Sequence, residues 1–364
     1  MAFHDDEPYF VIDLNELEHT YNDWINYLPT IKPFYAIKCN HNIDIIKHLH
    51  KLGCKFDCAS KNEISKILNL NYYNNNYNEN NIIFANPCKY PSHLIFAKKN
   101  NVSLMTFDNE FELLKIKKYY PEASLLLRIA IDDSKSVCKF NKKFGCKIEN
   151  IKNLLEIAKS NNLNIIGFSF HTGSKCQCPY IYYDGIKILK EYTDIANNIG
   201  FNIKILDIGG GFIKNTFKET ASIINEAIND FFKDSNIEFI AEPGRYMVES
   251  CQSLYLSIIG KKKIDNKFIY YINDSIYGSF NCILFDNQDP EILLINKEKE
   301  NEIKYESIIF GNTCDSLDEI KSSIYLPELD INDKLYIKNF GAYTSSASSN
   351  YFNGFKVENF IINL

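Results

Sequence analysis

The sequence predicts an α/β protein, a (β/α)8 barrel followed by a second, mainly β domain. Two observations support this prediction. Eight short apolar runs alternate with polar, helix-like segments between residues 34 and 241, an alternation that is typical of a parallel barrel. After about residue 250 the pattern changes to short alternating strands, and helical stretches become rare. A chain of 364 residues is long enough for both parts.

The eight apolar runs are the expected barrel strands. Helical periodicity marks the segments between them, for example 150–161 and 182–197. The expected strands, in order, are FYAI (34–37), KFDCA (55–59), IIFA (82–85), LMTF (104–107), LLLRIA (125–130), IIGFSF (165–170), ILDI (205–208) and EFIA (238–241).

The second domain is expected to be built from short strands such as 253–260, 267–272 and 333–340, with a terminal strand in 356–364. The residues before Asp13 are expected to pair with it. The domain boundaries are therefore 14–248 for the barrel, and 1–13 with 249–364 for the β domain. The Asn- and Tyr-rich segment 71–81 is interpreted as a surface loop or a frayed helix end.

Composition and charge exclude several functional classes. The net charge of -6 does not suit a nucleic-acid partner, which would require a basic face. The N-terminus MAFHDDEPYF lacks a basic region and an apolar run, and no apolar stretch is long enough for a membrane helix. The 11 scattered cysteines indicate reduced thiols and a cytoplasmic protein. Cys176 and Cys178 have no matching second pair, so no metal is expected and the segment is interpreted as a loop.

Polar residues follow the expected strands, at the barrel end where active sites form. In strand order they are Lys38, Asp57, Arg128, His171, Gly209-Gly210-Gly211 and Glu242-Pro243-Gly244-Arg245. The glycine run alone is equally well explained by a tight strand-to-helix turn. Because Arg245 follows the adjacent strand, we favour a phosphate site, in which bare backbone N–H groups and a guanidinium surround the anion.

Three of these residues suggest the chemistry of an aldehyde cofactor. Lys38 ends an apolar strand, where its amine could form a Schiff base; otherwise it is an exposed strand-end lysine. Glu242 could keep the ring nitrogen of pyridoxal phosphate protonated, or could form a salt bridge to Arg245. His171 could stack on a flat ring, although a hydrogen-bonded structural histidine is the commoner case.

At these positions the chain resembles the ornithine decarboxylase family, of eukaryotic type. This family has the alanine-racemase-like (fold type III) barrel and uses pyridoxal 5'-phosphate (PLP). The matching stretches run in order through most of the chain. They are FYAIKCN (34–40), KFDCAS (55–60), HTGS (171–174), DIGGGF (207–212), AEPGRYMV (241–248), NDSIYGSFNCILFD (273–286), GNTCDSLD (311–318), GAYT (341–344) and YFNGF (351–355).

The resemblance implies a role for each matching residue. Lys38 would be the Schiff-base lysine, Glu242 the partner of the pyridinium nitrogen, and His171 the residue stacked on the ring. The phosphate ligands would be Ser174, Gly211, Arg245 and Tyr343, and Gly209, Gly210 and Gly244 would be further cofactor-binding residues. The residues that order the cofactor side would be Asp57, Glu63 and Arg128.

At the substrate end, the resemblance implies Tyr277, Asp286, Asp315 and Phe352. Two aspartates suit the distal ammonium of a diamino acid, and L-ornithine is the substrate expected first. Cys314 would return a proton to the α-carbon, although any single cysteine is more often an ordinary buried thiol. Catalytic roles therefore fall to Lys38, His171, Glu242 and Cys314.

The family also implies a homodimer in which Cys314 and Asp315 complete the partner's site, with Lys143 and Asp318 as an intersubunit ion pair. A helix N-terminal cap is the alternative for Asp318. Two departures stand out. The family's N-terminal extension is nearly absent, and Phe285-Asp286-Asn287 replaces the more usual Tyr-Asp-His.

Three other functions are the alternatives to ornithine decarboxylation. Lysine or arginine could replace ornithine, because loop geometry sets the pocket length. An inactive regulatory homologue would lack cofactor residues that are present here. An amino-acid racemase on the same barrel does not fit the GNTCDSLD and NDSIYGSFN matches.

Overall fold

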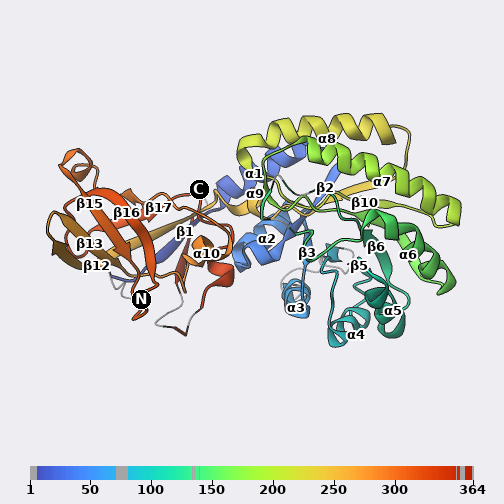
Figure 1. The fold of residues 1–364 in the computed structure, drawn as a ribbon, viewed down its shortest axis with the longest axis horizontal. Helices are drawn as coiled ribbons and strands as arrows, with labels where there is room; N and C mark the ends of the chain where they lie inside the picture. Colours follow the sequence, from blue (N-terminus) through green and yellow to red (C-terminus); the bar gives the residue numbers. More distant parts are fainter. Residues whose placement is uncertain are drawn as a thin grey trace. The chain divides into compact units, whose positions relative to one another are not determined.

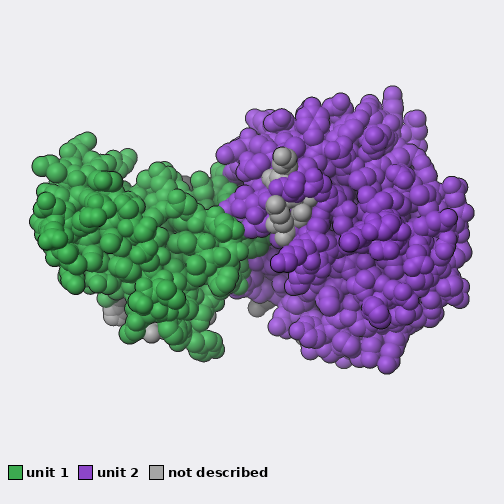
Figure 2. Space-filling view, in the orientation of Figure 1, with its two compact units in different colours: residues 1–18, 247–364 green, residues 19–246 purple. Residues whose placement is uncertain are grey.

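The computed structural model describes residues 6–70, 81–132, 134, 136–138, 140–349, 351–352 and 357–362. They form two compact units, coloured separately in Figure 2. The barrel unit is His19–Tyr246, and the β unit is Met1–Glu18 with Met247–Leu364. Most of the segment 71–81, expected to be a loop, lies outside the described residues. No helix in the described part of the chain is long and apolar enough to cross a lipid bilayer.

The barrel unit contains a closed parallel barrel, and all eight expected strands are confirmed (Figure 1). Phe34, Ile83, Leu126 and Ile240 are almost fully buried in one apolar cluster contributed by four of the strands, so the barrel encloses a packed core rather than a pore. In barrel order the strands are β10 (Ile205–Asp207), β11 (Glu238–Ala241), β2 (Ile31–Ala36), β3 (Lys55–Cys58), β4 (Ile82–Phe84), β5 (Leu104–Phe107), β6 (Ser124–Arg128) and β8 (Asn164–Ser169).

Helices between the strands cover the outside of the barrel (Figure 1). Side-chain caps define three of their starts: Asn42, Ser60 and Asn109 each accept a hydrogen bond from a backbone N–H in the first turn. The helices are α1 (Leu14–Tyr27), α2 (Ile43–Lys51), α3 (Lys61–Asn69), α4 (Pro91–Lys99), α5 (Glu110–Tyr119), α6 (Ile148–Ser160), α7 (Tyr180–Ile199), α8 (Phe217–Phe232) and α9 (Arg245–Val248), with 3-10 turns η1 (Ile37–Cys39) and η4 (Lys214–Thr216).

A small antiparallel ribbon, not expected from the sequence, is formed by β7 (Ser136–Cys138) and β9 (Ser174–Cys176). It pairs Ser136 with Cys176 and Cys138 with Ser174. The expectation of a loop around Cys176 is therefore corrected, because its backbone is paired as a strand. The ribbon holds Ser174, one of the expected phosphate ligands, in a fixed backbone position.

The β unit contains one sheet in the order β14-β17-β12-β13-β15-β16, and β1 pairs with both β12 and β18. The strands are β1 (Tyr9–Asp13), β12 (Gln252–Ile264), β13 (Lys267–Ile272), β14 (Leu293–Leu294), β15 (Lys304–Phe310), β16 (Glu319–Pro327), β17 (Lys334–Ile337) and β18 (Glu358–Ile362). The helical turns are α10 (Asn281–Phe285), η5 (Lys299–Asn301) and η6 (Ser345–Ala347). Tyr9, before Asp13, lies opposite Tyr255 of β12.

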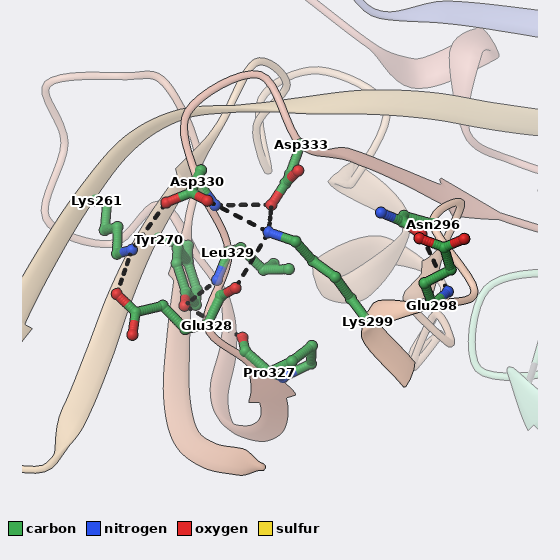
Figure 3. A network of polar contacts seen from close by, with 10 residues as sticks. All are labelled: Lys261, Tyr270, Asn296, Glu298, Lys299, Pro327, Glu328, Leu329, Asp330 and Asp333. Atoms are coloured by element: carbon green, nitrogen blue, oxygen red, sulfur yellow. Dashed lines mark hydrogen bonds and ion pairs between the residues drawn. The ribbon is translucent and has the colours of Figure 1, made fainter. Parts of the chain in front are cut away.

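A polar network fixes the turn that follows β16 (Figure 3). Lys261 contacts Glu328 at 2.7 Å and Asp330 at 3.3 Å, while Lys299 contacts Asp333 at 2.7 Å. Tyr270 accepts a hydrogen bond from the backbone N–H of Leu329 at 2.9 Å. Because the acidic partners are partly exposed, each ion pair adds little stability. The network serves to hold the turn against β12 and β13.

Candidate active site

Lys38 and Asp57 meet at the carboxyl end of two neighbouring barrel strands. Ala36, the last residue of β2, lies opposite Asp57 in β3, so the lysine two positions later reaches the aspartate. Lys38 Nζ lies 2.7 Å from Asp57 Oδ2, and the Asp57 side chain is fully buried. The structure therefore brings these two expected residues together, in a charge-assisted contact.

Glu63 lies beside this pair at the start of α3. Its Oε2 accepts a short hydrogen bond from the backbone N–H of Ala59, directly after β3. Burial raises the pKa of Glu63, an effect reinforced by the charge of Asp57 and offset in part by Lys38. The same N-terminal turn is capped by Ser60, whose hydroxyl accepts from the Glu63 N–H at 3.3 Å. This reciprocal cap fixes the carboxylate in place.

His171 follows β8 and is neutral. Its Nδ1 accepts a hydrogen bond from the backbone N–H of Gly173 at 2.9 Å, so its proton is carried on Nε2. Burial, followed by the positive charges of Arg128 and Lys38, lowers the pKa of His171 well below its usual value. A Cβ added to Gly210 would lie 3.0 Å from Nε2, so the glycine backbone lies against this nitrogen.

The glycine run after β10 forms a turn that only glycine can adopt. Gly209 has φ +66°, and a Cβ there would lie 2.2 Å from the Phe170 carbonyl oxygen. Gly211 has φ +104°, and its Cβ would lie 2.1 Å from Thr172 Oγ1. Any side chain at Gly209 or Gly211 would therefore strain the backbone and overlap with neighbouring atoms. The turn therefore brings bare backbone close to the segment that follows β8.

Glu242 and Asp207 form a buried carboxyl pair at the ends of β11 and β10. The Glu242 N–H donates to the Gly209 carbonyl at 2.7 Å, and Asp207 Oδ1 accepts from the Gly209 N–H at 2.8 Å. Burial, and then the neighbouring charge of Asp207, raises the pKa of Glu242 well above its usual value. Burial raises the pKa of Asp207 to about 7. The pair therefore retains protons at pH values where ordinary carboxyl groups have lost them.

Asp207 is a residue that the sequence reasoning missed. It stands first in the DIGGGF stretch and ends an apolar strand, the same signal that selected Lys38 and Glu242. Its side chain is fully buried and hydrogen-bonded to Glu242, and its charge interacts with those of Asp57 and Arg128. Apart from burial, the charges that act most on Glu242 are those of Asp207 and Asp57.

Two buried arginines are further candidate site residues of the barrel unit. Arg128 ends β6 and is 8% exposed, and its Nε and Nη2 have no hydrogen-bond partner among the described residues. Buried guanidinium donors of this kind suit an anion or another acceptor group. Arg245 begins α9 directly after Gly244 and is 4% exposed. Ser174, in β9, is likewise buried.

Three of the expected substrate residues meet in the β unit. The Tyr277 hydroxyl donates a short hydrogen bond to Asp315 Oδ2, and its ring lies 4.3 Å from that of Phe352. Asp315 Oδ1 accepts from the Leu317 N–H at 2.9 Å, and this bond, together with Tyr277, lowers the pKa of Asp315. Cys314, which directly precedes Asp315, is exposed.

Asp286 and Tyr343 lie in two other segments of the β unit. Asp286, directly after α10, is 6% exposed, and its Oδ2 accepts from Gln288 Nε2 at 2.6 Å. Tyr343 has φ +57°, a backbone conformation that a non-glycine residue rarely adopts. Gln288 also donates to the carbonyl of Ala342, which directly precedes Tyr343, at 2.9 Å. Gln288 therefore links the two segments.

The expectation that Asp318 caps a helix is wrong. Asp318 precedes strand β16 rather than a helix. It is 1% exposed, and its carboxylate accepts from the backbone N–H of Ile276 at 2.9 Å and from the N–H and hydroxyl of Thr313 at 3.0 and 2.7 Å. These bonds tie the loop that carries Cys314 to the loop that carries Tyr277.

A family described as "Pyridoxal-dependent decarboxylase, pyridoxal binding domain" matches residues 14–249. The chain is 41% identical to ornithine decarboxylase of Mus musculus, over 98% of this chain and 80% of the relative. It is also 41% identical to antizyme inhibitor 2 of Xenopus laevis, over 97% and 80%. The structure is similar to that of the Paramecium bursaria Chlorella virus arginine decarboxylase bound to agmatine, with TM-score 0.94 and 34% identity over 99% and 96% of the two chains.

Proposed function

Because this chain belongs to the pyridoxal-dependent decarboxylases, with PLP as cofactor, we propose that it converts L-ornithine to putrescine and CO2 in polyamine biosynthesis. One observation carries the catalytic part of this proposal. Lys38 and Asp57 are in contact, and the charges of Lys38, Asp57 and Arg128 act on the buried Glu242, Asp207 and His171. Such a cluster of perturbed groups at one barrel end is typical of an active site.

The groups of the barrel unit fit PLP. The left-handed glycine turn supplies backbone N–H groups without side chains, and Arg128 has buried donors without partners; both suit an anionic cofactor. Glu242 is a buried carboxyl group whose ionisation is opposed by Asp207 and Asp57, and a protonated ring nitrogen would supply the opposite charge that favours its ionised form. We assign residues 14–248 as the PLP-binding domain, and 1–13 with 249–364 as the β domain.

We assign the cofactor contacts as follows. Lys38 would hold the cofactor aldehyde, Glu242 the ring nitrogen, and the neutral His171 one face of the ring. Asp57 and Glu63 would hold the Lys38 end of the site. The phosphate would be held by Ser174, Gly211, Arg245 and Tyr343, with Gly209, Gly210 and Gly244 shaping the surrounding backbone.

When bound, PLP supplies an electron-withdrawing ring that stabilises the negative charge left on the α-carbon as CO2 departs. The residues of this chain do the rest. Glu242 keeps a proton at the ring nitrogen, and Cys314 returns a proton to the α-carbon as general acid. Asp286 and Asp315 bind the distal ammonium of the substrate, while Tyr277 and Phe352 line that end. The hydrogen bond from Tyr277 holds Asp315 in one orientation.

The substrate is tested by CO2 release from ornithine, lysine and arginine, each with PLP added. Ornithine is expected to give the highest kcat/KM, because two aspartates suit a distal cation and the curated relative from Mus musculus is an ornithine decarboxylase. Arginine is the rival to test first, because the Chlorella virus arginine decarboxylase is structurally similar. A highest kcat/KM with arginine or lysine would refute the choice of ornithine.

An inactive regulatory homologue is the alternative of another class, since the Xenopus laevis antizyme inhibitor 2 is equally similar in sequence. The contact of Lys38 with the fully buried Asp57 and the buried Glu242–Asp207 pair favour the enzyme, because a protein without cofactor chemistry has no need for such costly buried carboxyl groups. The two are separated by the visible absorbance of PLP retained after gel filtration. We expect it in the wild type and not in Lys38→Ala. A wild type that retains no PLP and releases no CO2 would support the alternative.

We further propose a homodimer in which Cys314 and Asp315 complete the partner's site. The β unit has a cavity of about 350 Å³ lined by Tyr277, Leu284, Phe285 and Leu317. Phe285 is 75% exposed and Leu317 74%, so apolar surface suited to a partner subunit surrounds this cavity. A cytoplasmic location is also proposed, because no disulfide joins any of the eleven cysteines, all of which lie in the described part of the chain, as suits a reducing compartment.

A further inference from the structure

Gln288 connects the proposed substrate aspartate to the segment that carries Tyr343. Its Nε2 donates to Asp286 Oδ2 at 2.6 Å and to the Ala342 carbonyl at 2.9 Å. A side-chain amide has two N–H donors, so one Gln288 makes both contacts at once. Each partner is an acceptor only, which makes the amide the correct group for this position.

The backbone around Gln288 is held as firmly as its side chain. The N–H groups of Asp286 and Gln288 both donate to the Cys282 carbonyl, each at 3.1 Å. Asn287 between them has φ +49°, the left-handed conformation that ends a helix and that asparagine tolerates. Gln288 is therefore directed back across the end of α10, toward Asp286.

Fixing Asp286 matters because of where its carboxylate lies. Asp286 is 6% exposed, and a carboxylate removed from water requires hydrogen bonds and a defined orientation. A short aspartate can offer its oxygens to a substrate cation from only one or two side-chain rotamers. The hydrogen bond from the Gln288 side-chain amide to Asp286 Oδ2 selects among these rotamers. It thus fixes the orientation in which the Asp286 carboxylate meets a substrate cation.

We propose that Gln288 is a positioning residue for substrate binding: its amide holds the Asp286 carboxylate in the one orientation that suits the distal ammonium of ornithine. This inference rests on the proposed function.

The test compares holoenzymes with Gln288→Leu and Gln288→Glu to the wild type, on ornithine, lysine and arginine. Gln288→Leu removes both donors. Gln288→Glu keeps the shape but places a carboxylate against Asp286. For both variants we expect the KM for ornithine to rise by about tenfold, a smaller change in kcat, and a reduced preference for ornithine over lysine.

Asp289→Asn is the matched control. Asp289 is the next residue, its side chain is 90% exposed, and its ion pair is with Lys321 rather than with Asp286. We expect this variant to keep the wild-type KM and substrate preference. Thermal denaturation of all three variants shows whether the fold is intact. A merely structural role of Gln288 would lower Tm and reduce activity on all three substrates in the same proportion.

Putrescine binding, measured by calorimetry on the holoenzymes, gives a readout independent of turnover. The Gln288 variants are expected to bind putrescine more weakly by the same factor as the rise in KM. Unchanged putrescine affinity and unchanged ornithine preference in both variants, with an active wild type, would overturn the role of Gln288 and leave the proposed function intact. A wild type that releases no CO2 from ornithine would instead overturn the proposed function, and this inference with it.

Discussion

The buried carboxyl pair of Asp207 and Glu242 makes the stability of the cofactor-free protein depend on pH. The pKa of Asp207 is raised to about 7 in the folded chain, compared with about 4 for an unfolded aspartate. Between these values the folded state binds more protons than the unfolded state, so the free energy of unfolding decreases as pH rises. Stability from this group is therefore fully present below about pH 4 and lost by about pH 7.

Asp207→Asn should remove the part of this dependence that comes from Asp207, while keeping the acceptor for the Gly209 N–H. Glu242, whose pKa is also raised by burial, still contributes in both proteins. Between pH 5 and pH 8, we expect the Tm of the cofactor-free variant to fall by less than that of the wild type. The corresponding difference in the free energy of unfolding is on the order of a few kcal/mol. His171, whose lowered pKa acts in the opposite direction, is common to both proteins and cancels. Parallel Tm profiles for the two proteins would contradict the prediction.

Single residues were predictable where a charged side chain interrupts an apolar pattern. Lys38 stands out for this reason, and the structure brings it to Asp57. Asp207 shows the same pattern, but aspartate before a glycine turn is also a common turn residue. Gln288 could not be found, because its role depends on the path of its side chain back across a turn. The assigned functions of all these residues remain predictions.

At the scale of the element, replacing Gly209 in the turn after β10 should destabilise the protein and weaken the proposed cofactor site. Gly209→Ala adds a Cβ 2.2 Å from the Phe170 carbonyl oxygen at φ +66°, and a backbone atom cannot swing aside. We expect a loss of about 2 kcal/mol or more in unfolding free energy, together with weaker PLP binding in a spectroscopic titration, because the turn is the proposed phosphate site.

Gly53→Ala is the matched control for this substitution. Gly53 also has a left-handed φ, +96°, but its Cβ would meet only Tyr21 Oη, at 3.5 Å. We therefore expect a loss of about 1 kcal/mol from backbone strain alone, with unchanged PLP affinity. Equal effects of the two variants on PLP binding would mean that the glycine turn is not part of the cofactor site.

Strand existence was easier to predict than strand pairing. Most residues of the eight barrel strands are buried, with exceptions such as Lys32 and Asn164, so the strands appear in the sequence as short apolar runs. Their ends shifted by up to three residues, as at β2, which begins at Ile31 rather than at residue 34. The β7–β9 ribbon was missed because SVC and SKC carry no alternating apolar pattern. Its pairing joins segments far apart in the chain, which local periodicity cannot reveal.

At the scale of the whole molecule, the proposed dimer divides each active site between two chains. Lys38 belongs to the barrel unit and Cys314 to the β unit. The exposed Phe285 and Leu317 provide apolar surface for association. Asp318 holds the loop of Cys314 through bonds within its own chain, so this loop can be preformed before the partner arrives.

Shared sites predict that two inactive variants can restore activity to each other. Lys38→Ala and Cys314→Ala are each expected to lose most ornithine decarboxylation as homodimers. After mixing, dissociation and reassociation, half of the dimers carry one of each chain, and one of their two sites has both residues intact. Activity should therefore recover to about a quarter of the wild type.

A control in which Lys38→Ala is mixed with the Lys38→Ala, Cys314→Ala double variant should recover none, since no site regains Lys38. If the Lys38→Ala and Cys314→Ala mixture also recovers none, while sedimentation shows that mixed dimers have formed, Lys38 and Cys314 act within one chain and the shared-site proposal is wrong.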